Sequence, residues 1–152
     1  MISQEDGVGK QVILLRSAQQ HYVDRALREL GLYCGQDTLL LLLAQEEGLT
    51  QVQLAQRMSC EPQTINKTLR RMQKAGLVER RSDPDDGRLT RVYLTRQGRT
   101  LVQPIQEIVS RCEQRLTAGL TCEERLLVRR LLIHMRSNFD APLCDLSASD
   151  EE

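Results

Sequence analysis

The spacing of hydrophobic and polar residues predicts helices over most of this chain. Between residues 10 and 30, apolar side chains recur every three or four positions, which indicates a helix with one apolar face. Residues 35–48 include a nearly continuous run of leucines, which predicts a helix buried on most sides. A shorter helix is predicted over 51–58, because Thr50 and Gln53 stand at the two positions of a capping box.

The middle of the chain predicts one more helix and then a pair of strands. Pro62 suits the first position of a helix, where its missing N–H has no partner to lose, and Gly76 ends that helix. Strands are predicted over 77–81 and 90–94, because turn-forming Pro, Asp and Gly residues fill the segment between them. This segment is therefore expected to be a β-hairpin.

Two further helices are predicted after the hairpin. Thr95 caps a long helix that carries an apolar stripe. Thr121 and Glu124 form a capping box that opens the last helix, which extends to about Asn138. The expected fold class is mainly α with a small β-hairpin. The order of elements is that of a winged helix-turn-helix with additional N- and C-terminal helices.

Length and cysteine usage narrow the class of protein. A chain of 152 residues is long enough for one domain with a sizeable core. It contains no apolar run of about 18 residues and begins with a polar, acidic segment, so neither a membrane span nor a secretory signal is expected. Its five cysteines are scattered and form no Cys-x-x-Cys pair, which argues against a disulfide framework or a zinc site. We expect a cytoplasmic protein without a cofactor.

The distribution of charge points to nucleic acid, although the net charge is zero. Residues 51–100 hold eleven cations and five anions, a net charge of +6, so the flanking regions are acidic. A basic segment between acidic flanks is typical of a DNA-contacting module within a larger fold. A basic helix followed by a hairpin is suited to reading double-stranded DNA, with the helix in the major groove and the hairpin over the minor groove.

Candidate DNA contacts lie on the helix that begins at Pro62, outside its apolar positions Ile65, Leu69 and Met72. Three uncharged polar residues are expected to read base edges: Gln63, Thr64 and Asn66. Three cations are expected to hold phosphates: Arg70, Arg71 and Lys74. Arg88 is placed at the tip of the hairpin, where a guanidinium suits the narrow minor groove of A·T-rich DNA.

The combined motifs resemble the MarR family (multiple-antibiotic-resistance regulators) of transcription factors. The similarity covers about residues 10–138 and rests on three segments: 48–55 (GLTQVQLA), 69–80 (LRRMQKAGLVER), and 83–88 (DPDDGR) with the following 92–98 (VYLTRQG). The Asp-x-Arg pattern of Asp86 and Arg88 is the most family-specific part.

The resemblance implies an organisation and a function. It implies a winged helix-turn-helix at about 35–95 between dimerisation helices at about 10–30 and 96–138, with a disordered start (1–9) and an acidic disordered tail (139–152). Members are homodimers and mostly repressors that bind a pseudo-palindromic operator. Many are released from DNA by small phenolic or aromatic carboxylate ligands, or by cysteine oxidation.

The resemblance also implies roles for single residues. Lys67 stands where the family often has a cationic DNA contact, and Asp86 resembles the family's carboxylate that holds the wing by a salt bridge. His21, Tyr22 and Tyr33 lie where members often form an effector pocket. For His21, a surface or interface histidine is the alternative.

Two cysteines are candidates for a redox signal. Cys34 immediately precedes the second helix, and a helix N-terminus favours the reactive thiolate. Cys60 precedes the basic helix and can pack on Ile65 as a hydrophobic staple, so its modification would disturb that helix. The alternative for both is that they act as small buried hydrophobic side chains.

Two other classes of protein are alternatives to a DNA-binding regulator. An enzyme is not expected, because the sequence shows no catalytic triad, metal-ligand cluster or phosphate-binding glycine loop. A winged helix that binds only other proteins stays open as an alternative, and the basic hairpin argues against it.

Overall fold

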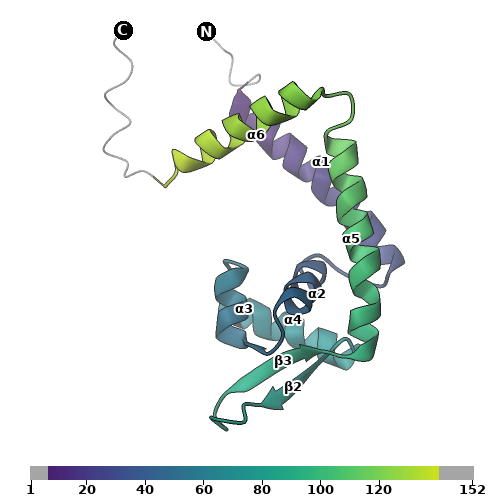
Figure 1. Ribbon diagram of the computed structural model, residues 1–152, viewed down its shortest axis with the longest axis vertical. Coiled ribbons are helices and arrows are strands. Elements are labelled where there is room, and N and C mark those ends of the chain that lie inside the picture. Colours follow the sequence, from purple (N-terminus) through teal and green to yellow (C-terminus); the bar gives the residue numbers. More distant parts are fainter. Residues whose placement is uncertain (1–6, 141–152) are drawn as a thin grey trace. The chain divides into compact units, whose positions relative to one another are not determined.

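The computed structural model describes residues 7–140. Residues 1–6 and 141–152 lie outside this range, and they make up most of the two segments predicted to be disordered, 1–9 and 139–152. Cys144 lies outside the described residues as well. Within the described range, six helices and three strands follow one another (Figure 1). They are α1 (Val8–Glu29), α2 (Gln36–Gln45), β1 (Leu49–Thr50), α3 (Gln51–Arg57), α4 (Pro62–Lys74), β2 (Val78–Ser82), β3 (Thr90–Leu94), α5 (Arg96–Leu116) and α6 (Cys122–Ser137). The expected mainly helical fold with a small hairpin is confirmed.

Internal contacts divide the chain into two compact units, Met1–Glu113 and Gln114–Glu152. The first contains α1 to α4, the sheet and most of α5, whereas the second contains the end of α5 and the whole of α6. Helix α6 buries none of its side chains within a single chain. That residues 10–138 form one domain stays a prediction.

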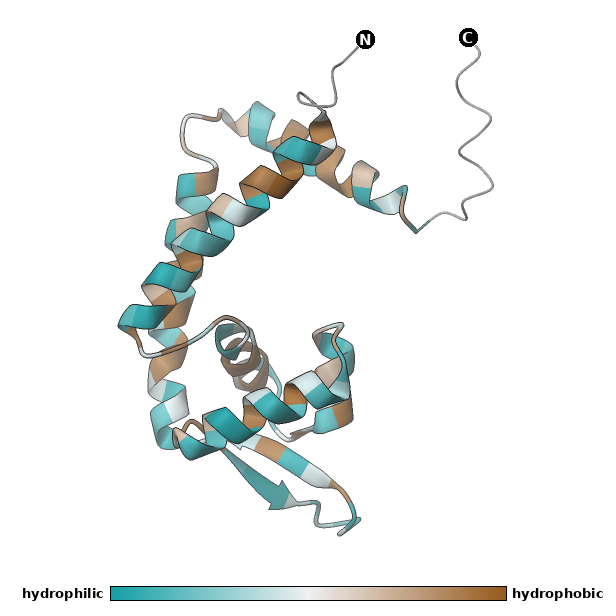
Figure 2. Cartoon of the chain, turned by 180° about the vertical axis from the view of Figure 1, so that it is seen from behind, coloured by the Kyte–Doolittle hydropathy of each residue, from teal (hydrophilic) through white to brown (hydrophobic). Residues whose placement is uncertain are grey.

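The core of the first unit is built around α2 and α4. Leu39, Leu40 and Leu43 of α2 are fully buried, as the leucine run predicts, and Figure 2 shows α2 as mostly hydrophobic. Ile65 and Leu69 of α4 are buried as well. They are four residues apart, so they lie on one face of the helix and leave the opposite face to solvent.

The sheet has three antiparallel strands in the order β1-β3-β2, so β3 is central. The hairpin of β2 and β3 is confirmed, with Arg80 opposite Val92 and Ser82 opposite Thr90. Strand β1 was not predicted from the sequence. Its two residues pair with Val92 and Arg91, and a strand of this length has no alternation of its own to recognise.

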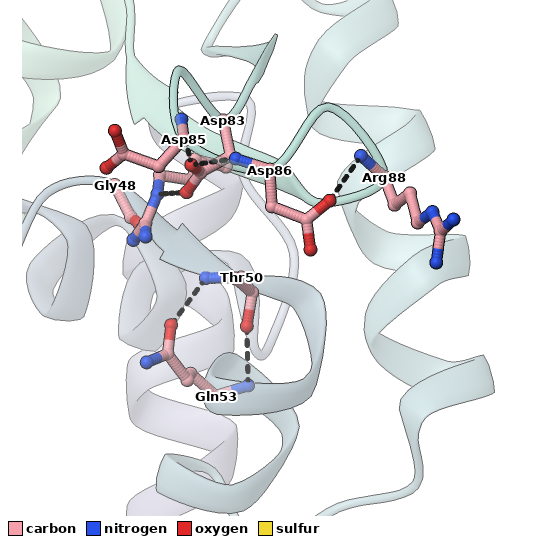
Figure 3. Close-up of polar contacts among 8 residues, drawn as sticks. Gly48, Thr50, Gln53, Asp83, Asp85, Asp86 and Arg88 are labelled. Atoms are coloured by element: carbon pink, nitrogen blue, oxygen red, sulfur yellow. Dashed lines mark hydrogen bonds and ion pairs between the residues drawn. The ribbon is translucent and has the colours of Figure 1, made fainter.

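Helix α3 begins where the capping box predicts. The N–H of Thr50 donates to Gln53 Oε1 at 2.8 Å, and the N–H of Gln53 donates to Thr50 Oγ1 at 3.3 Å (Figure 3). A side-chain bond from Gln51 Nε2 to the carbonyl oxygen of Pro62, 3.0 Å long, then joins α3 to the first turn of α4. The turn between the two helices is therefore held at both ends.

A glycine lets α5 approach the start of β2. A Cβ atom at Gly98 would lie 2.1 Å from the carbonyl oxygen of Leu77, far inside van der Waals contact. Thr95 fixes the same corner, because its N–H donates to Leu77 at 3.1 Å and its Oγ1 accepts from the N–H of Gly98 at 3.0 Å. The hairpin is thereby anchored to the helix that follows it.

The helices at the chain ends depart from the sequence-based boundaries only slightly. Helix α1 begins at Val8, so residues 8 and 9 are helical and do not belong to a disordered N-terminus as predicted. Helix α6 has the predicted capping box between Thr121 and Glu124. Along α1 and α6, many large hydrophobic side chains are exposed.

Candidate nucleic-acid interface

The solvent face of α4 gathers nearly all of the predicted DNA contacts. An open surface hollow is lined by Gln63, Asn66, Lys67, Arg70, Arg71, Gln73 and Lys74. Four of these residues are cations and none is an anion, so the surface attracts phosphate. Thr64 is exposed on the first turn of α4 but does not line the hollow, and Gln73 was not among the predicted residues.

One of these side chains also contacts the sheet. Arg80 Nη2, from β2, donates to Asn66 Oδ1 at 2.9 Å. Asn66 is accordingly half-buried, whereas Gln63 and Lys67 are exposed. The basic helix and the hairpin are therefore linked by a direct side-chain contact.

A buried carboxylate organises the turn of the hairpin. Asp83 Oδ1 accepts from the N–H groups of Asp85, at 2.8 Å, and Asp86, at 3.0 Å (Figure 3). Its other oxygen forms an ion pair with Arg91, and Arg91 Nη1 donates to the carbonyl oxygen of Gly48 at 2.8 Å. The backbone N–H donors of Asp86 and Asp85, and then Arg91, hold the pKa of Asp83 below its ordinary value of 3.8. Asp83 thus joins the wing turn to the loop before β1.

The prediction that Asp86 holds the wing by a salt bridge is wrong for the described residues, because Asp83 makes that ion pair instead. Asp86 Oδ1 accepts the backbone N–H of Arg88 at 3.0 Å. In Figure 3 the guanidinium of Arg88 extends away from the Asp86 carboxylate, and Arg88 is exposed. Asp86 therefore shapes the backbone at the tip, and the Arg88 side chain is available to a ligand outside the turn.

The residues predicted for an effector pocket do not share one environment. His21 is exposed on α1, Tyr22 is half-buried, and the Tyr33 side chain is 68% exposed in the α1–α2 loop. The backbone at Tyr33 is held by Gln36, whose Oε1 accepts the N–H of Tyr33 at 2.9 Å. Their function as a pocket stays a prediction.

The two candidate redox cysteines differ in exposure. Cys34 is exposed, and its Sγ accepts from Gln20 Nε2 at 3.1 Å. Helix α2 is capped by Gly35, whose N–H donates to Asp37 Oδ1 at 2.9 Å, so a carboxylate already occupies this helix start. Cys60 is half-buried against the core, as a hydrophobic staple would be. Its redox function stays a prediction too.

The described residues also bear on metal binding and on membrane insertion. Residues 7–140 contain no group of three or more His, Cys, Asp or Glu side chains placed to hold a metal ion. Over the same range, none of the helices has the length and apolar character needed to cross a membrane.

Comparison with known proteins places these features in a family. The sequence profile of the MarR family matches residues 35–90. The HTH-type transcriptional repressor Rv2887 of Mycobacterium tuberculosis is 33% identical over 116 residues, which cover 76% of this chain and 84% of that protein. Among solved structures, a MarR transcriptional regulator from Methanosarcina mazei Go1 is 25% identical, with a TM-score of 0.75 over 88% of this chain and 96% of that one. A mutant MarR from E. coli, complexed with operator DNA, is 24% identical and has a TM-score of 0.76 over 84% of this chain and 92% of that one.

Proposed function

The chain belongs to the MarR family of transcription regulators, which are not enzymes, and we propose that it works as a homodimeric repressor at a pseudo-palindromic operator. The observation that carries this proposal is the cationic face of α4 beside a hairpin with an exposed arginine at its tip. The wide major groove of B-DNA admits an α-helix, and the narrow minor groove attracts an inserted guanidinium. We therefore assign α4 to the major groove and Arg88 to the minor groove.

Contacts on α4 divide by chemistry. Lys67, Arg70, Arg71 and Lys74 neutralise phosphates and set the register of the protein on the duplex. Gln63 and Thr64, exposed on the first turn, carry the donors and acceptors that distinguish bases. Affinity and specificity thus come from different side chains of one helix.

The dimer is supported by apolar surface at both chain ends. Helix α1 exposes four neighbouring large hydrophobic residues, Val12, Ile13, Leu14 and Leu15, and α6 exposes another six, Leu126, Leu127, Val128, Leu131, Leu132 and Ile133. Exposed apolar side chains in this number on two helices are typical of an interaction surface. A two-fold axis would present two α4 helices to DNA, so the site should be an inverted repeat with half-site centres about 10 bp apart.

Selection from a random duplex library tests this proposal. The full-length chain is expected to enrich an imperfect inverted repeat, and sedimentation of the protein on the selected duplex should give two chains per site. A consensus without two-fold symmetry, or binding of a single chain, would contradict the homodimer. Failure to enrich any sequence would contradict DNA reading itself.

We further propose that a small phenol or aromatic carboxylate releases the repressor in the cytoplasm. The ligand would bind near Tyr22 and Tyr33 and favour a dimer whose two α4 helices have the wrong spacing for the operator. Such a shift needs a difference in ligand affinity between the two dimer forms of a few kcal/mol. The exposed ring of Tyr33, on a backbone fixed by Gln36, supports this position.

Cysteine oxidation is the second candidate signal. Of the two candidate thiols, Cys34 is the more exposed, which favours Cys34 over Cys60 as the site of oxidation. A variant with Cys34→Ser and Cys60→Ser separates the two signals. The ligand proposal expects phenols to release wild type and variant equally. Release of the wild type alone by peroxide, with no response to any phenol, would establish the thiol signal instead.

A further inference from the structure

A series of side-chain contacts connects the loop before β1 to the arginine at the wing tip. Arg91 Nη1 donates to the carbonyl oxygen of Gly48 at 2.8 Å, and Arg91 Nε pairs with the carboxylate of Asp83. Asp83 Oδ1 accepts the N–H of Asp86 at 3.0 Å, and Asp86 Oδ1 accepts the N–H of Arg88 at 3.0 Å (Figure 3). The backbone of Arg88 is therefore tied to Gly48 through a series of three side chains.

The loop at the start of this series is itself well fixed. Gly48 is buried, and its N–H donates to the carbonyl oxygen of Val92 in β3 at 3.1 Å. The ring of Tyr93 lies so close that a Cβ atom at Gly48 would be 3.0 Å from its hydroxyl oxygen. Glu47 forms an ion pair with Arg99 of α5, 2.5 Å long. The loop thus provides a firm support to which the wing turn can be attached.

Internal bonds give the wing turn its shape, and Arg91 attaches it to the loop. The N–H of Asp83 donates to the carbonyl oxygen of Leu89 at 2.9 Å, and the N–H of Leu89 donates to that of Asp86 at 2.9 Å. Neither bond reaches the loop before β1, whereas the side chain of Arg91 does. Its partner Asp83 has a side chain only 3% exposed, so salt screens this ion pair much less than a surface pair.

The contacts of Arg91 bear on how the wing meets DNA. We propose that Arg91 is a positioning residue for DNA binding, which holds the wing so that Arg88 enters the minor groove without further ordering of the turn. This inference rests on the proposed function, which assigns Arg88 to that groove. A wing that became ordered only on binding would lose part of its affinity to the entropy of ordering.

A double-variant cycle on the full chain tests this role. Fluorescence anisotropy with the selected operator compares the wild type with Arg91→Met, Arg88→Ala and the variant that carries both changes. Arg91→Met keeps an apolar stem without donors and should weaken binding by roughly three- to tenfold, the cost of ordering one flexible side chain. Because Arg91 acts through Arg88, the double variant should bind within about twofold of Arg88→Ala alone.

Arg81→Met is the matched control. Arg81 is directly opposite Arg91 in the hairpin, but its side chain is 61% exposed and lies over the ring of Tyr93, 4.7 Å from the ring centre. Any loss of affinity from removing this charge should therefore add to that of Arg88→Ala. A general effect of charge would instead make Arg81→Met and Arg91→Met behave alike.

A second variant decides the question if Arg91→Met fails to fold, which circular dichroism would show. Arg91→Met leaves the buried carboxylate of Asp83 without its cation, and an unpaired buried charge is costly. Asp83→Asn combined with Arg91→Met removes both charges and keeps a side-chain oxygen that can accept the N–H of Asp86. This combination should lose affinity to the same extent, and only while Arg88 is present.

The inference and the proposed function fail in different ways. Losses from Arg91→Met and Arg88→Ala that add in the double variant would overturn the inference. Operator binding by Arg91→Met that equals that of the wild type would overturn it too. In both cases the wild type still selects its operator, so the proposed function stands. A wild type that selects no sequence overturns the proposed function itself.

Discussion

Helices α4 and α6 bury their hydrophobic residues to very different extents. On α4, Ile65, Leu69 and Met72 are at most 1% exposed, and the opposite face is polar and cationic. On α6 no residue is buried, and Leu126 is 63% exposed. The apolar residues of α4 are thus buried within one chain, whereas those of α6 are exposed to water in a single chain.

If the proposed homodimer forms, this difference identifies α6 as the part of the fold that a second copy covers. Fully burying one Leu or Ile side chain contributes about 1.5–3 kcal/mol, so covering the apolar residues of α6 is a large driving force for association. The winged helix-turn-helix carries its own core, whereas in the proposed homodimer α6 would be covered by the second copy. Two kinds of variant, in the core and on α6, should therefore behave differently.

The largest expected effect is on the core of the winged helix-turn-helix. Leu69→Ala should lower the free energy of unfolding by about 2–5 kcal/mol, because it leaves a cavity in a fully buried site. Urea denaturation followed by circular dichroism measures it. Leu126→Ala is the control, and its effect should grow with protein concentration, since it acts through the dimer. If both variants lose the same free energy of unfolding at every protein concentration, the proposed difference between the core and α6 is contradicted.

The next effect concerns association. Leu131→Asp places a carboxylate on the apolar face of α6 and should weaken dimerisation at least a hundredfold, or about 3 kcal/mol. Sedimentation equilibrium measures the dimer dissociation constant. Arg129→Asp adds the same carboxylate beside the apolar residues on the same helix and should weaken the dimer much less. An unchanged dissociation constant in Leu131→Asp would show that α6 is not the interface.

A smaller effect is expected at the wing. Arg88→Ala should weaken operator binding by about 1–3 kcal/mol and leave folding unchanged, because it removes a minor-groove contact at the exposed tip. Fluorescence anisotropy at fixed salt measures the loss. Arg111→Ala removes the same charge from α5 and serves as the control. Equal affinities of wild type and Arg88→Ala would refute the minor-groove assignment.

The smallest effect is a local dependence on pH. The folded pKa of Asp83 is depressed, so its contribution to wing stability is complete above the unfolded pKa near 3.8 and is lost as pH falls through the lower folded value. Hydrogen exchange of the hairpin amides should therefore accelerate below about pH 4 relative to those of α4. Asp83→Asn should speed this exchange already at neutral pH, whereas Asp85→Asn, at an exposed residue, should not. If exchange does not depend on Asp83, the turn is stabilised by its backbone alone and the role given to this carboxylate is wrong.

Local signals in the sequence predicted most of the fold. The capping boxes at Thr50 and Thr121, Pro62 at a helix start and the turn residues before Thr90 each act within a few residues, so a sequence pattern reveals them. The exposed cationic face of α4 followed from its helical period in the same way.

Local sequence patterns did not predict contacts between residues that are distant in the sequence. The pairing of Asp83 with Arg91 depends on the register of the hairpin, and the sequence alone favoured Asp86. The bond between Asn66 and Arg80 needs β2 to lie against α4, and strand β1 exists only because β3 offers it an edge. Tertiary packing decides such partners, and one sequence does not encode it in a local pattern.

The salt dependence of operator binding tests most directly whether the cations of α4 contact the phosphates of duplex DNA. Each phosphate contact contributes about −0.9 to the slope of log Kobs against log salt concentration. The triple variant Arg70→Ala, Arg71→Ala, Lys74→Ala removes three α4 cations from each of two chains, so its slope should be shallower than that of the wild type by about five. Equal slopes for the wild type and the variant, or a wild-type slope near zero, would contradict the account.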